Sequence, residues 1–212
     1  MPGRLSGEMQ ESCLQFERLS KRFGRVQALR EVSGAVASGR MLLVRGPNGS
    51  GKSTLLRCLA GLLRPDCGKI VTVENGQELS YEERVQRVGF LAPALGLYRE
   101  LTVLENLELL ARFRKVPRET ARELAAQFRL PAARRAGELS SGMLQRLRWT
   151  ALLVHGPWIW LLDEPLEHLD PSGIQLCQEL LQGHLQRGGL AVVASPTPLD
   201  LARNADELVL AG

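Results

Sequence analysis

The segment GPNGSGKS at residues 46–53 constrains the fold of this chain more than any other feature. It follows the apolar run at residues 41–44 and precedes a helix-like stretch at residues 55–63. A strand, a glycine-rich turn and a helix in this order form a phosphate-binding loop, because glycines let successive backbone N–H groups point into one concavity. The helix N-terminus adds a favourable dipole for an anion. The segment therefore predicts that the chain binds a nucleoside triphosphate.

Two side chains of this loop are expected to act directly on the phosphates and their metal. Lys52 places a positive charge on the outer phosphates, and the Ser53 hydroxyl is a hard oxygen ligand of the kind that Mg²⁺ prefers. A nucleoside triphosphate with Mg²⁺ is therefore the expected ligand. The expected binding residues of the loop are Gly46, Pro47, Asn48, Gly49, Ser50, Gly51, Lys52, Ser53 and Thr54.

The charge pattern argues against a nucleic-acid partner. The formal net charge is +4, but the arginines are spread along the chain in short clusters, and aromatic residues make up only 5% of it. A nucleic-acid footprint would need a continuous basic stripe or interleaved aromatics. We interpret the clusters, including Arg146 and Arg148, as solvated faces with a few phosphate contacts.

Cysteine spacing and hydropathy favour a cytoplasmic protein. The four cysteines form no Cys-x-x-Cys pair and have no histidine at ligand spacing, so reduced thiols in the core are expected. Residues 1–12 lack the apolar stretch of a signal peptide, and no apolar run is long enough to span a membrane. Any membrane role would be that of a peripheral subunit.

Strands and helices alternate along the chain, which predicts an α/β protein with a P-loop NTPase core. The core would hold a mainly parallel sheet and carry an antiparallel β lobe and a helical insert. We expect a single domain at residues 13–212, with a helical subdomain at about 100–156 and an N-terminal extension at 1–12. Strands are expected at residues 14–23, 28–36, 70–73, 88–91, 159–162, 191–194 and 208–210, and helices at 55–63, 102–111, 119–128, 143–154 and 171–188.

Two acids end the apolar strand at residues 159–162. Ligands bind at the carboxyl ends of parallel strands, so Asp163 and Glu164 would both face the ligand crevice. Asp163 is expected to hold Mg²⁺, and Glu164 to polarise the water that attacks the γ-phosphate.

A second candidate phosphate site precedes the helix expected at residue 143. Ser140 or Ser141 can cap that helix, and together with Gly142 these small residues can also bind a phosphate at its N-terminus. A second phosphate site in another lobe makes sense if each triphosphate is sandwiched between two copies of the domain. The predicted assembly is therefore a homodimer.

These motifs together resemble those of ATP-binding cassette ATPases over the whole chain. Residues 46–53 are similar to the P-loop of that family, residues 139–142 to its signature sequence, and residues 159–164 to its magnesium-and-base strand. The resemblance further implies that Asp170 belongs to the D-loop and that Phe23 stacks on adenine, although a lone Phe is also a common core residue.

Two helper residues of the family are missing. Alignment places Ala94 where the family usually carries a Gln and Pro196 where it carries a His. None of His155, His168 and His184 matches that position, and His168 is the one histidine near the D-loop. With Glu164 retained, slow hydrolysis is expected, because phosphoryl transfer depends on positioning and charge stabilisation.

Residues 96–107 and the closing Pro198-Leu199-Asp200 are similar to the ATP-binding subunits of haem-export, or cytochrome c maturation, systems. This resemblance implies integral-membrane partner subunits and a peripheral location on the cytoplasmic face of the inner membrane. Three alternatives stay open: another small exporter of the multidrug or polysaccharide type, a weakly hydrolysing ATP-dependent clamp, and a soluble cassette protein acting on DNA or ribosomes.

Overall fold

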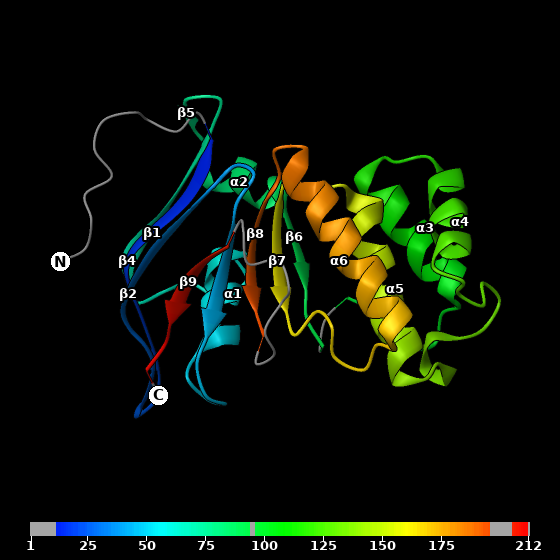
Figure 1. Cartoon of the computed structure of the whole chain (residues 1–212), viewed down its shortest axis with the longest axis horizontal. Coiled ribbons are helices and arrows are strands. Elements are labelled where there is room, and N and C mark those ends of the chain that lie inside the picture. The colour runs from blue at the N-terminus through cyan, green and yellow to red at the C-terminus, as the bar shows by residue number, and fades with distance from the viewer. Residues whose placement is uncertain (1–11, 94–95, 196–204, 212) are drawn as a thin grey trace.

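A parallel sheet forms the centre of the molecule. The computed structural model describes residues 12–93, 96–195 and 205–211. In this part of the chain the sheet has five strands in the order β6-β7-β8-β3-β9, and all neighbours run parallel (Figure 1). The strands are β3 (Met41–Arg45), β6 (Val88–Leu91), β7 (Ile159–Asp163), β8 (Leu190–Ala194) and β9 (Ala205–Val209).

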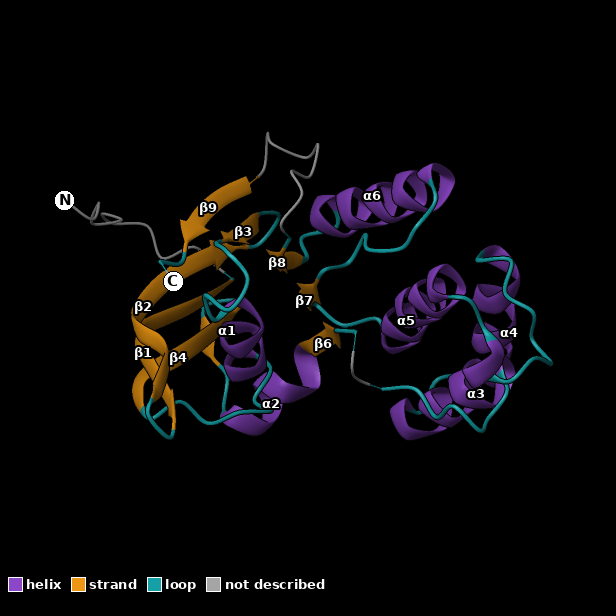
Figure 2. Ribbon diagram, turned by 90° about the horizontal axis from the view of Figure 1, so that it is seen from below, coloured by secondary structure: helices purple, strands orange, loops and turns teal. Residues whose placement is uncertain are grey.

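An antiparallel sheet covers helix α1 (Lys52–Leu59) from the side opposite the central sheet (Figure 2). Its order is β2-β1-β4-β5, and Leu14 and Phe16 pack with Leu55 of α1 in one apolar core. The strands are β1 (Cys13–Phe23), β2 (Val26–Ala37), β4 (Cys67–Glu74) and β5 (Gln77–Glu78).

Three helices form a separate layer beyond the edge strand β6 (Figures 1 and 2). They are α3 (Val103–Arg114), α4 (Arg118–Gln127) and α5 (Ser141–His155). The short helix η1 (Ala136–Glu138) precedes α5, and α6 (Pro171–Gln186) packs alongside this layer. A second apolar core joins them to the central sheet. This layer places the N-terminus of α5 far from α1, on the other side of β6 and β7.

The Asn106 side chain forms hydrogen bonds with the backbone of the loop that precedes α3. A capping box of Thr102 and Glu105 begins this helix. The buried Asn106 side chain accepts from the Tyr98 N–H and donates to the carbonyls of Tyr98 and Thr102, at 2.8, 3.0 and 2.9 Å. Buried polar groups are costly unless paired, so this residue holds the loop and the helix together.

The predicted α/β class with parallel, antiparallel and helical parts is confirmed. The helix expected at residues 55–63 ends earlier, at Leu59, because Gly61 turns the chain at a φ of +75°. Helix α2 (Tyr81–Arg87) is an element that hydrophobic periodicity does not indicate; its capping box of Ser80 and Glu83 is the signal that could have found it. The prediction that the cysteines lie in the core is wrong for Cys67, which is exposed.

A buried histidine makes stability depend on pH. His184 stacks on Trp160 with ring centroids 3.9 Å apart, and burial lowers its pKa to about 4. In the unfolded chain the pKa of this histidine is about 6.5, so the neutral ring contributes its full stability to the fold above that pH. This contribution is lost as the pH falls towards 4. We expect the parent to lose roughly 3 kcal/mol more than His184→Gln between pH 7 and 4 in urea unfolding. Parallel pH curves for the two proteins would contradict this assignment.

Candidate functional site

The glycine-rich loop joins β3 to α1 and is pressed against neighbouring backbone. Gly51 has a φ of +96°, and a Cβ placed there would lie 2.1 Å from the Ala28 carbonyl oxygen. A Cβ on Gly46, whose φ is +149°, would lie 2.6 Å from the carbonyl oxygen of Leu210. Both positions therefore require glycine for the backbone conformation and for the close approach.

Polar groups inside this loop fit a phosphate. The buried Lys52 ammonium donates to the carbonyl oxygens of Gly46 and Pro47 at 2.8 and 3.0 Å, which holds its charge at the loop. The buried Ser50 hydroxyl has no hydrogen-bond partner within the described residues. Within the described part of the chain no side chain caps α1, so its first N–H groups stay available to an anion, and a Cβ on Gly49 would meet no described atom within 4 Å.

The acids at the end of β7 lie close to the same loop. Asp163 is buried, and the Glu164 N–H donates to the Ala194 carbonyl at 2.8 Å. Burial, together with a hydrogen bond to Glu167 and the charges of Glu167 and Asp163, raises the pKa of Glu164, while the Lys52 ammonium lowers it. Because β3, β8 and β7 run parallel, the glycine-rich loop after β3 and the acids at the end of β7 lie at the same edge of the sheet.

The donor set fits a hydrated Mg²⁺. Among the described residues no group of three His, Cys, Asp or Glu side chains could hold a metal. Mg²⁺ commonly keeps several waters and takes one or two carboxylates plus substrate phosphates. The single buried carboxylate of Asp163 and the hydroxyl of Ser53, both at the loop end of the sheet, meet that requirement.

The second predicted phosphate site lies at the exposed N-terminus of α5. Ser140 caps the helix by accepting from the Met143 N–H at 3.3 Å, and Ser141 is exposed. A Cβ on Gly142 would lie 2.7 Å from the His168 carbonyl oxygen, so the chain packs tightly here. Because α5 lies beyond β6 and β7, the structure does not bring these residues to the loop of the same copy (Figure 2).

Asp170 has partners within the chain. Its carboxylate caps α6 through the Gly173 N–H, as the sequence predicts, and also accepts from Ser172. Arg146 lies 2.5 Å away and is the main reason that the pKa of Asp170 falls to about 2. These contacts hold the segment 165–170, which follows Glu164, at the point where α6 begins.

Comparison with known proteins identifies this arrangement. Residues 29–167 match the family model described as ABC transporter. The chain belongs to the ABC transporter family. It is 40% identical to the cytochrome c biogenesis ATP-binding export protein CcmA of Rhizobium meliloti, over 89% of this chain and 93% of that protein. The corresponding protein of Rhodobacter capsulatus is 36% identical, over 90% of this chain and 84% of that protein.

Solved ABC structures share the fold. The ATP-binding subunit of an ABC transporter superposes with a TM-score of 0.80 at 27% identity, over 93% of this chain and 85% of that one. A dimeric ATP-binding cassette in a post-hydrolysis state with ADP and Pi gives 0.77 at 26% identity, over 93% and 94%. The predicted family is therefore confirmed.

Other residues expected from the ABC resemblance fall in different places. Phe23 is 50% exposed at the end of β1, with the Lys21 ammonium 5.8 Å from its ring centroid, so it is not a core residue. His184 is a buried packing residue, and the exposed His168 lies 3.5 Å from Glu167. Ala94 and Pro196 lie outside the described residues.

Several side chains around Glu164 in this ABC subunit were not anticipated from the sequence. Gln145 and Trp149 of α5 both donate to the Pro165 carbonyl at 2.8 Å, and the Glu167 N–H donates to the Glu164 carbonyl oxygen at 3.3 Å. Arg146 and Arg148 were interpreted as solvated charges, but both are engaged inside the chain. The LQRLRW sequence that follows the signature residues carries these contacts and was the available signal.

Proposed function

We propose that this chain is the ATP-hydrolysing subunit of an exporter that serves cytochrome c maturation. The observation that carries the hydrolytic part is that β3 and β7 run parallel, so the loop that holds the Lys52 ammonium and the acids Asp163 and Glu164 follow strands at the same edge of the sheet. The transport role rests on the relatives of similar length named as cytochrome c biogenesis export proteins.

In this proposal two copies complete each site. Ser140, Ser141 and Gly142 of one copy face the triphosphate bound by the glycine-rich loop of the other, since they lie apart within a single chain. The solved dimeric cassette of this fold supports the arrangement. ATP would then hold the copies together head to tail.

The chemistry follows from the residues present. Lys52 binds the outer phosphates, Ser53 and Asp163 would hold Mg²⁺, and that ion would neutralise charge on the phosphates. Glu164 orients the attacking water and accepts its proton. Only the ionised form of Glu164 can accept the proton. Because the pKa of Glu164 is raised, hydrolysis should fall off at a higher pH than it would with an unperturbed carboxylate as the base.

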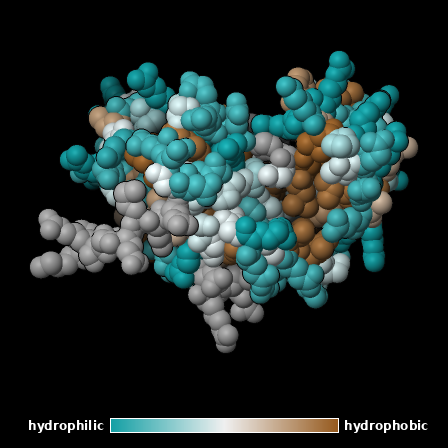
Figure 3. Space-filling view, turned by 90° about the horizontal axis from the view of Figure 1, so that it is seen from above, coloured by the Kyte–Doolittle hydropathy of each residue, from teal (hydrophilic) through white to brown (hydrophobic). Residues whose placement is uncertain are grey.

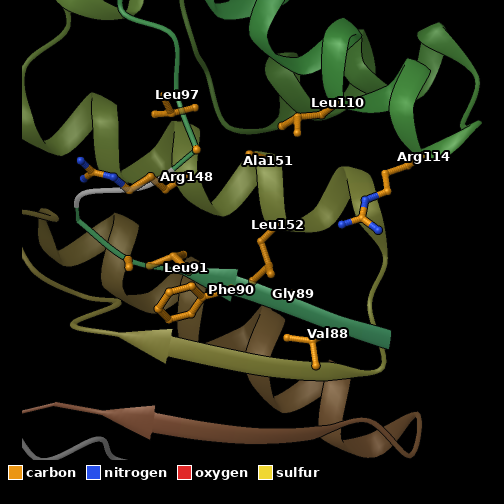
Figure 4. Close-up of a pocket in the computed structure, with 12 residues that line it drawn as sticks. Val88, Gly89, Phe90, Leu91, Leu97, Leu110, Arg114, Arg148, Ala151 and Leu152 are labelled. Atoms are coloured by element: carbon orange, nitrogen blue, oxygen red, sulfur yellow. The ribbon is translucent and has the colours of Figure 1, made fainter. Parts of the chain in front are cut away.

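Membrane subunits would dock on the groove between β6 and α5. No helix in the described ranges has the length and hydropathy to cross a membrane. The groove encloses about 140 Å³ and is lined by apolar side chains from β6, α3 and α5, among them Leu110 and Leu152 (Figure 4). Its only charged lining residues among those described are Arg114 and Arg148.

Because the groove lining is apolar and carries two arginines, the docked segment is expected to be apolar and to carry an acid. Hydrophobic surface is exposed in the hollow between the strand half and the helical half of the molecule (Figure 3). Tyr98 and Phe113 near the groove are 58% and 73% exposed, which extends the apolar area. This location would set the chain on the cytoplasmic face of the inner membrane as a peripheral subunit.

Chromosomal replacement tests the proposal. Cells carrying Leu110→Glu or Glu164→Gln should lose c-type cytochromes by haem staining, because the first variant blocks docking and the second blocks hydrolysis. Only Leu110→Glu should also leave the membrane fraction. An exposed control, Glu119→Gln on α4, should behave as the parent. Normal c-type cytochromes in both variants, with a defect in drug or polysaccharide export, would favour the alternative exporters.

A further inference from the structure

Arg148 connects the docking groove to the loop that carries Glu164. It projects from α5 at the rim of the groove (Figure 4). One guanidinium nitrogen lies 2.5 Å from the Pro93 carbonyl oxygen, in the loop that follows β6, and another donates to the Gln145 side-chain oxygen at 3.0 Å. One half-buried side chain therefore joins two segments that are 55 residues apart.

The connection continues through Gln145. This side chain is 1% exposed, and its amide nitrogen donates to the main-chain carbonyls of Glu164 and Pro165 at 3.1 and 2.8 Å. Gln145 thus uses its oxygen to accept from Arg148 and its nitrogen to hold the backbone of the candidate base. A charged donor strengthens such a chain of hydrogen bonds, because each bond polarises the next.

Arg148 also interacts with Glu167, three residues after Glu164. Burial lowers the pKa of Arg148, whereas the nearby Glu167 carboxylate favours its charged form. The Glu167 N–H in turn donates to the Glu164 carbonyl oxygen at 3.3 Å. Arg148 therefore interacts with the Glu164 loop by two routes, one through Gln145 and one through Glu167.

We propose that Arg148 is a positioning residue that transmits occupancy of the docking groove to Glu164. Arg148 and Gln145 together link Pro93, in the loop after β6, to the backbone of Glu164. The inference rests on the proposed function, since it requires that Glu164 is the base and that the groove receives a partner. A segment entering the groove would displace Pro93 or Arg148, and Gln145 would carry the shift to the Glu164 backbone.

Steady-state ATP hydrolysis by the 212-residue chain tests the positioning role. Arg148→Met should lower kcat about tenfold and leave KM for ATP within about twofold, because small misplacement of a catalytic group costs rate and not ground-state binding. Arg148→Lys keeps one charged donor and should recover part of kcat. Gln145→Leu should show the same loss, and adding Arg148→Met to it should cause little further loss, since both belong to one chain of contacts. Arg122→Met on α4, an exposed partner of Glu108, is the matched control.

The outcomes separate this inference from the proposed function. If Arg148→Met keeps the parental kcat while Glu164→Gln is inactive, the positioning role is wrong and the hydrolytic assignment stands. If Glu164→Gln hydrolyses ATP like the parent, both are wrong. If Arg148→Met does not fold, Arg148→Lys decides: parental kcat overturns the inference, and reduced kcat with unchanged KM supports it.

Discussion

Glu164→Gln should bind ATP as tightly as the parent chain and hydrolyse it about a hundredfold more slowly, or slower still. The glutamine keeps the size of the side chain and the hydrogen bond from its backbone N–H to Ala194, so the loop after β7 is retained. It cannot accept a proton, and general-base catalysis commonly contributes about 10²–10⁴ in rate. Single-turnover release of phosphate from Mg-ATP, with nucleotide binding measured separately, checks both halves of this expectation.

The same measurement separates an enzyme from a regulatory clamp. If the parent chain is itself as slow as Glu164→Gln, the missing Gln and His have cost the protein its turnover, and the weakly hydrolysing clamp is the better account. A tenfold weaker ATP affinity in Glu164→Gln would instead show that Glu164 has a binding role.

Gly51→Ala should destabilise the chain by about 2–6 kcal/mol and abolish ATP binding. The new Cβ would lie 2.1 Å from the Ala28 carbonyl oxygen, in backbone that cannot rotate away, and φ is +96°. Backbone strain of about 1–3 kcal/mol adds here to the overpacking of a tight contact, which costs a further 1–3 kcal/mol or so. Urea unfolding and titration with an ATP analogue measure the two effects.

Gly49→Ala is the matched control in the same loop. Gly49 also has a positive φ, +83°, but a Cβ there would meet no atom within 4 Å. The control should therefore be destabilised by the backbone strain alone, about 1–2 kcal/mol. Equal destabilisation by the two substitutions would contradict the contact between the loop and β2, because strain alone would then account for Gly51.

The sequence predicted the central sheet, the glycine-rich loop and the acids after β7 because each depends on local signals. The strand, glycine turn and helix around Lys52 form within one short segment, and Asp163 and Glu164 follow an apolar strand directly. Asp170 and Ser140 were found as helix caps for the same reason: their partners are three residues away.

The contacts that hold Glu164 could not be predicted because they join distant segments. Gln145 reaches Glu164 across 19 residues, and Arg148 reaches Pro93 across 55. Charge patterning alone indicated that Arg146 and Arg148 are solvated, since it gives no information on which carbonyl or carboxylate lies opposite. Helix α2 was missed because its seven residues are too few for hydrophobic periodicity to show.

The mass of Glu164→Gln in solution with and without Mg-ATP tests the central claim most directly. If ATP is sandwiched between the loop of one copy and residues 140–142 of another, the slow variant should have the mass of two chains with Mg-ATP and of one chain without it. Adding Ser141→Arg, an exposed change at the N-terminus of α5, should return the mass to one chain while the loop still binds ATP. A single-chain mass for Glu164→Gln in saturating Mg-ATP would contradict the account.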